Sequence, residues 1–186
     1  MVDRNGVGPW LGVWAVALGV ALAAPGQAAE APAGHESSSG VLVAGGGAIL
    51  VVAVWVTPGL VDHPYYVARV PSAAERDRHR ALAGGHTVMS FELSNRSRLL
   101  VEGPVVVNLF VDEEIHRVVE GSAAANVVLR TDQTFERIYV FPKLPAGARS
   151  VVLLVQAPQL TERGRWIGYL PQFRLGFDLR RLTFPP

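Results

Sequence analysis

The chain has 186 residues, no cysteine and a formal net charge of +1. This length suits one domain with a sizeable hydrophobic core. The lack of cysteine excludes disulfides, thiolate catalysis and zinc–thiolate or iron–sulfur centres, and the near-neutral charge supplies no general attraction for nucleic acid.

The first predicted element is an apolar segment over residues 10–24, WLGVWAVALGVALAA, preceded by Asp3 and Arg4. It is shorter than the roughly 20 residues that a membrane-spanning helix needs. Pro25-Gly26 and several small residues follow it, as at a signal peptidase site. We therefore predict a signal peptide or first membrane anchor over residues 1–28, with a small-residue linker over 29–40.

A second apolar segment covers residues 41–61 and contains no charge. Its length matches a bilayer core, and Trp55 near one end suits the membrane interface. The glycine triplet 45–47 would allow a close contact with another helix in the membrane. We predict a transmembrane helix here. The alternative is a buried β-hairpin of Val41–Ala44, a glycine turn and Ala48–Val56, which the many valines favour.

The distribution of arginine leaves the membrane topology open. The 29–40 linker has no lysine or arginine, whereas arginines lie on both outer sides of the apolar pair. The positive-inside rule then predicts a helical hairpin with both ends in the cytoplasm. A single N-terminal anchor would instead place everything after it outside. We expect a membrane-associated protein, with the side that holds the C-terminal domain undecided.

Residues 62–85 are predicted to be a juxtamembrane segment. Tyr65-Tyr66 has the composition of an interfacial belt. Ser72 and Glu75 form a capping box that predicts a short basic helix from Ala73 to Ala83. This helix is expected to be a solvated spacer, with a basic collar on anionic lipid as the alternative.

From residue 86 to residue 186 the hydrophobic period changes to two, which is typical of strands. Met89, Phe91 and Leu93 share one face of the first such segment. Short alternating segments follow, with turns predicted between them, for example at Glu102-Gly103. The strands are expected near 86–93, 99–101, 105–111, 115–119, 127–129, 135–141, 151–155, 166–170 and 173–179.

The turn Leu144-Pro145-Ala146-Gly147 resembles the corner turns of immunoglobulin-like domains. The predicted fold is mainly β: an antiparallel immunoglobulin-like β-sandwich over residues 86–186, preceded by one or two N-terminal apolar helices.

No residue pattern predicts catalytic, cofactor-binding or metal-binding residues. The five histidines have no ligand spacing and are expected in solvated or turn positions: His35, His63, His79, His86 and His116. Asp112-Glu113-Glu114 lacks the alternating ligands of a calcium loop, and no serine lies in a GxSxG motif. Asn95-Arg96-Ser97 matches the N-glycosylation pattern.

These observations favour a non-enzymatic, membrane-tethered β-sandwich that acts as an interaction module or accessory subunit of a membrane complex. Its expected partners are membrane lipid and a protein, with no nucleic acid and no cofactor. The alternative is a secreted or periplasmic ligand-binding β-sandwich that signal cleavage releases.

Overall fold

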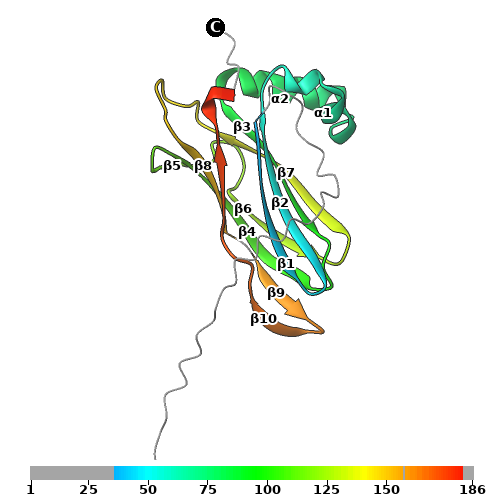
Figure 1. Ribbon diagram of the computed structural model, residues 1–186. Helices are drawn as coiled ribbons and strands as arrows, with labels where there is room; N and C mark the ends of the chain where they lie inside the picture. Colours follow the sequence, from blue (N-terminus) through cyan, green and yellow to red (C-terminus); the bar gives the residue numbers. More distant parts are fainter. Residues whose placement is uncertain (1–35, 157, 182–186) are drawn as a thin grey trace, which may run out of the picture.

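The computed structural model describes residues 36–156 and 158–181, which form two packed antiparallel sheets with short helices at one end (Figure 1). The strands are β1 (Ser37–Ala44), β2 (Gly47–Val56), β3 (Thr87–Asn95), β4 (Leu100–Val111), β5 (Glu114–His116), β6 (Ala124–Leu129), β7 (Gln133–Phe141), β8 (Val151–Gln156), β9 (Gln159–Glu162), β10 (Arg165–Tyr169) and β11 (Phe173–Phe177). The helical segments are η1 (Leu60–Asp62), α1 (Pro64–Arg69), α2 (Ala73–Gly85) and η2 (Leu179–Arg181).

One sheet has the order β1-β2-β3-β7, and the other has the order β10-β9-β4-β8-β11. β4 organises the second sheet, because β5 and β6 also pair with it. All the pairings between strands are antiparallel. The predicted mainly β, antiparallel architecture is therefore confirmed.

The main hydrophobic core lies between the two sheets. The predicted inward face of β3 is confirmed, since Met89, Phe91 and Leu93 are buried there. The ring of Phe91 meets the ring of Tyr139 on β7 edge to face, with 5.9 Å between the centroids. Burial of such aromatic and aliphatic side chains is the main favourable term in folding.

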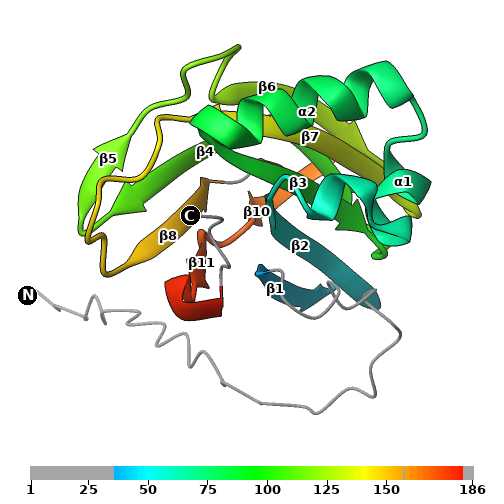
Figure 2. The same cartoon turned by 90° about the horizontal axis from the view of Figure 1, so that it is seen from above.

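A second, smaller core lies on the outer side of the first sheet. There Val54, Val56 and Val88 pack with Leu60 and Tyr66. Figures 1 and 2 show α1 and α2 at this end of the molecule, beside β3. The predicted helix start at Ser72 is confirmed, because the Ser72 hydroxyl accepts a hydrogen bond from the Glu75 N–H as the N-cap of α2.

The transmembrane helix predicted over residues 41–61 is wrong. The segment belongs to the β1–β2 hairpin and to η1, and Trp55 lies in the core against the ring of Phe177 instead of at an interface. β2 is apolar on both faces because one face meets the main core and the other meets the smaller core. The sequence of a strand that is covered on both faces is a continuous apolar run, and it therefore resembles the sequence of a membrane span.

The glycine triplet serves the hairpin turn. Gly45 and Gly46 have φ values of 58° and 71°, the left-handed pair that a two-residue type I′ turn requires. Gly47 lies so close to the next turn that an added Cβ would stand 2.0 Å from the carbonyl oxygen of Arg96. The alternative hairpin interpretation describes this segment correctly.

The predicted 1–28 signal or anchor and the linker as far as residue 35 lie outside the described residues, so no N-terminal apolar helix is shown. The turn expected at Glu102-Gly103 is wrong, because β4 continues through both residues while pairing with β6. The order β1-β2-β3-β7 also differs from the immunoglobulin arrangement, in which the first, second, fifth and fourth strands share a sheet.

Among the described residues, the helices are too short or too polar to cross a bilayer.

Candidate functional site

In the described part of the chain, no three His, Asp or Glu side chains gather as metal ligands. One expectation about the histidines is wrong. His79, expected in solvent on the basic helix, is 5% exposed, and its Nδ1 lies 2.9 Å from the hydroxyl of Tyr66. Tyr66, expected at a lipid headgroup, is likewise buried.

Burial controls the acid–base behaviour of this pair. Desolvation lowers the pKa of His79, an effect that Glu75 opposes and Arg78 reinforces. Desolvation also raises the pKa of Tyr66, with a smaller contribution from Glu75. Both groups are therefore neutral near pH 7, and their hydrogen bond fixes α1 to α2. This is a structural role.

The arginines of the helical region are also held by neighbours. Arg76 donates to the carbonyl oxygens of Val70 and Pro71. Arg78 pairs with Glu120, and Arg80 pairs with Asp62 and Asp77. These contacts attach the predicted spacer helix, α2, to the rest of the fold.

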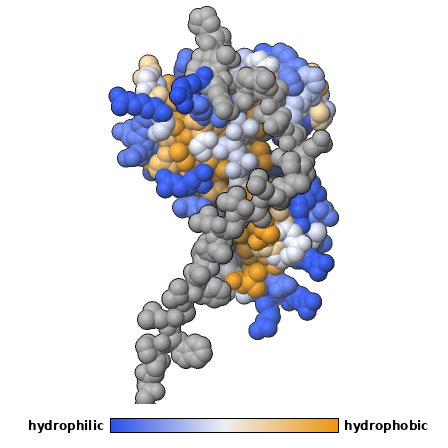
Figure 3. All heavy atoms as spheres, in the orientation of Figure 1, coloured by the Kyte–Doolittle hydropathy of each residue, from blue (hydrophilic) through white to orange (hydrophobic). Residues whose placement is uncertain are grey.

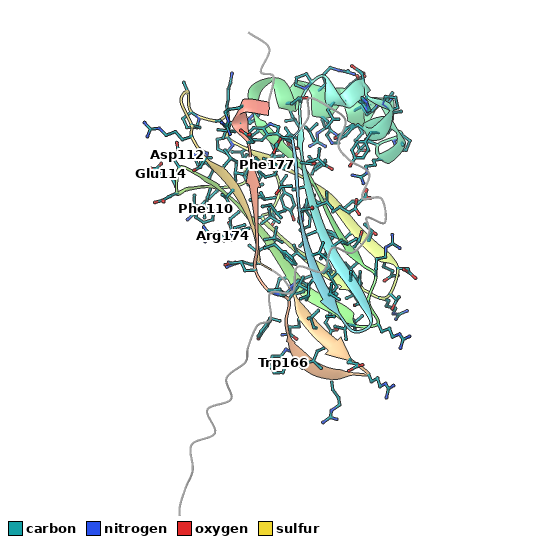
Figure 4. The ribbon with its side chains drawn as sticks, in the orientation of Figure 1. Phe110, Asp112, Glu114, Trp166, Arg174 and Phe177 are labelled. Carbon is teal, nitrogen blue, oxygen red and sulfur yellow. The ribbon has the colours of Figure 1, made fainter. Side chains whose placement is uncertain are left out.

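Asp112 closes the loop before β8. Its carboxylate accepts hydrogen bonds from the backbone N–H groups of Ser150 and Arg149, which lower the pKa of the carboxyl. In Figure 4, Asp112 and Glu114 lie at the β4–β5 end of the molecule. Asp112 and Glu113 also have φ values of 47° and 74°, so they form the turn of the β4–β5 hairpin.

Asn95 is the buried member of the glycosylation pattern. Its side chain is 0% exposed, and its Nδ2 donates to the carbonyl oxygens of Leu99 and Leu129. Its Oδ1 accepts from the N–H and hydroxyl groups of Ser97. A folded chain cannot present this amide to a glycan, so the pattern marks a buried polar junction.

A cavity of about 380 Å³ lies at the helical end of the molecule, between the end of β2, the end of α2 and the loop before β8. Trp55, Leu144 and Leu179 form apolar parts of its wall, and His86 and Lys143 contribute polar groups. Its size lies within the range of small-molecule sites.

The most distinctive surface is the β9–β10 hairpin, which projects from the end opposite to α1 and α2 (Figure 1). We call its exposed side chains Trp166, Ile167 and Tyr169 the aromatic tip. They are 60%, 49% and 66% exposed. β10 pairs only with β9 among the described strands, so its outer edge has no strand partner among them. Figure 4 shows Trp166 on this hairpin, far from Asp112.

A β-bulge shapes the aromatic tip. Trp166 pairs with Thr161 and Gly168 pairs with Leu160, so one extra residue stands on β10 between them. In a regular strand, residues 166 and 169 would point to opposite faces. The extra residue changes this alternation, and the rings of Trp166 and Tyr169 meet edge to face, 5.7 Å apart.

The hairpin is anchored firmly at its base. Leu160 and Leu170 are buried in the main core, and the hydroxyl of Thr161 donates to Glu102 on β4 at 2.6 Å. At the far end, Arg163 and Gly164 have φ values of 49° and 76°, which gives the tight type I′ turn. The aromatic tip is thus held on a stiff support.

Exposed arginines lie on the hairpin and on two turns at the same end of the molecule. The β3–β4 turn lies beside β9, because Leu100 pairs with Thr161, and the Thr131 hydroxyl of the β6–β7 turn donates to the carbonyl oxygen of Ser97. These arginines are Arg96, Arg98, Arg130, Arg163 and Arg165. The acids beside them are Asp132, Glu162 and Glu102, which accepts the Thr161 hydroxyl, so five positive and three negative groups give a formal charge of +2. In Figure 3, hydrophobic and hydrophilic side chains lie together at this lower end of the view.

The sequence predicted a strand over residues 166–170 but missed both β9 and the aromatic tip. Arg163-Gly164 between two strand-like runs was an available turn signal. This turn signal does not predict that the rings of Trp166 and Tyr169 are exposed. Their exposure depends on the position of β10 at the edge of the sheet, which the sequence does not show.

No protein-family model, curated protein or solved structure matches this chain.

Proposed function

We propose that this protein is a non-enzymatic β-sandwich that acts as an interaction module or accessory subunit at a membrane, with the aromatic tip as its contact surface. The observation that carries the proposal is the exposed Trp166–Tyr169 pair on an anchored hairpin. Tryptophan, tyrosine and arginine are the residues most enriched among the energetic centres of interfaces. Use of hairpins and loops at one end for contact is also how immunoglobulin-like sandwiches bind.

The membrane part of the proposal rests on residues 1–28 alone. Residues 41–61 lie in the sandwich and in η1, so they are no longer available as a tether. A single N-terminal anchor or signal would place the sandwich outside the cytoplasm. We therefore propose an exported domain that residues 1–28 either tether or release.

The test compares the full chain with a Trp166→Ser/Tyr169→Ser variant after mild detergent extraction. The expected result is that the wild-type chain elutes in a larger assembly and the variant elutes as a free monomer with the same melting temperature. Ile115→Ser is the matched control, because Ile115 is 50% exposed on β5, beside Glu114 and far from the hairpin (Figure 4). A monodisperse wild-type monomer would count against the proposal.

A second candidate is a secreted or periplasmic ligand-binding domain. The cavity at the helical end supports it. Substitution of Leu144 by Trp would fill that cavity and should abolish binding of any small ligand that native mass spectrometry detects.

A further inference from the structure

The partner of the aromatic tip can be named by its chemistry. We propose that the tip docks on the surface of an anionic lipid bilayer, a proposal that rests on the proposed function and specifies its contact. Trp166 and Tyr169 have an apolar body and a polar N–H or O–H group, which suits the headgroup region of a bilayer. They are exposed together on one face of β10, next to Ile167.

Charge complementarity selects the anionic bilayer. The hairpin and the turns at the end that carries the tip have, together with Glu102, a formal charge of +2, whereas the whole chain has +1. Of the five exposed arginines at this end of the molecule, Arg96 is paired with Asp132 at 3.2 Å. Arg163 and Arg165 flank the turn of the projecting hairpin, where a flat anionic surface would meet them first. Arginines this close to anionic headgroups attract them electrostatically.

The shape of the hairpin supports shallow docking. β10 has only five residues, and Leu160 and Leu170 fix its base in the core. The backbone groups on its free edge would lie in the hydrated headgroup layer, where they can still bond to water, and not in the hydrocarbon, where unpaired groups are costly. The tip therefore reaches the interface and does not span the bilayer.

The experiment follows the fluorescence of Trp166 in the full chain. Trp10→Phe and Trp14→Phe leave Trp55, which is 4% exposed, and Trp166 as the remaining tryptophans. The probes are vesicles of phosphatidylcholine alone and of phosphatidylcholine with phosphatidylglycerol. We expect the emission of Trp166 to shift to the blue with the anionic vesicles only, and high salt to reverse the shift.

Variants identify the groups responsible. Arg163→Gln/Arg165→Gln should weaken the fluorescence-monitored binding by about five-fold for each arginine removed. The control Arg117→Gln changes an exposed arginine outside this end and should leave the binding unchanged. Trp166→Phe should abolish the blue shift, which assigns the signal to this ring.

The proposal is overturned if Trp166 emission stays constant at saturating anionic vesicles, even when residues 1–28 hold the chain on them. It is also overturned if both vesicle types give the same shift. If the vesicle results fail in either of these ways while the Trp166→Ser/Tyr169→Ser variant still leaves its assembly in the extraction experiment, the tip binds a protein instead of lipid. In that case the proposed function stands and the lipid assignment fails.

Discussion

At the scale of single residues, buried polar side chains hold this fold together at both ends. At the helical end, the hydrogen bond between Tyr66 and His79 joins α1 to α2. Because burial lowers the pKa of His79 below its ordinary value of 6.5, the unfolded chain binds a proton before the folded chain does. This contribution to stability is complete above pH 6.5 and is lost as the pH falls toward the folded-state pKa.

We expect the free energy of unfolding to decrease on acidification from pH 7.5 to pH 5. Urea unfolding followed by circular dichroism measures this dependence. His79→Gln should remove most of the decrease in this range, since glutamine keeps a polar group near Tyr66 without titrating. If the free energy of unfolding depends on pH equally in the wild type and the variant, His79 is not responsible for the decrease.

Asn95 holds the opposite end. Asn95→Ala should destabilise the protein by about 2–4 kcal/mol, because it leaves buried carbonyl, amide and hydroxyl groups without their partner. The control is Asn126→Ala, which removes an exposed amide from β6 and should change stability by less than about 0.5 kcal/mol. Chemical denaturation gives both values, and equal effects would contradict the assigned role.

At the scale of elements, the sequence predicted strands where only one face is apolar. The alternation in β3 and β8 identified their inward residues, such as Phe91 and Leu153, because the burial of one face imposes a period of two. The same alternation rule failed for β2, because β2 is apolar and buried on both faces. It also missed the aromatic tip, whose exposure arises from a bulge and from missing neighbours rather than from a local pattern.

The β1–β2 turn provides a direct check of the hairpin. Gly47→Ala should destabilise the protein by about 1–3 kcal/mol, because the new methyl group collides with the backbone of Arg96. Gly59→Ala is the control, since a Cβ there meets no atom within 4 Å. Thermal unfolding distinguishes the two, and a neutral Gly47→Ala would contradict the packing of these turns.

At the scale of the whole molecule, the sandwich begins at β1. The second apolar segment, residues 41–61, therefore contributes to the hydrophobic core and is not a membrane tether. The molecule then has a helical end with a cavity and an opposite end with aromatic and arginine side chains. Sequence alone predicted a transmembrane helix over residues 41–61, where the chain forms strands of the sandwich. Amino-acid hydrophobicity does not distinguish burial between sheets and helices from burial in lipid.

The central claim is that the aromatic tip is covered in the cell, and cysteine labelling tests it most directly. The chain has no cysteine, so Ile167→Cys and Ile115→Cys each give a single reporter. A maleimide reagent applied to disrupted, detergent-free cells and to purified protein should label position 115 equally in both samples. Position 167 should be labelled only after purification. Equal labelling of position 167 in the two samples would contradict the claim.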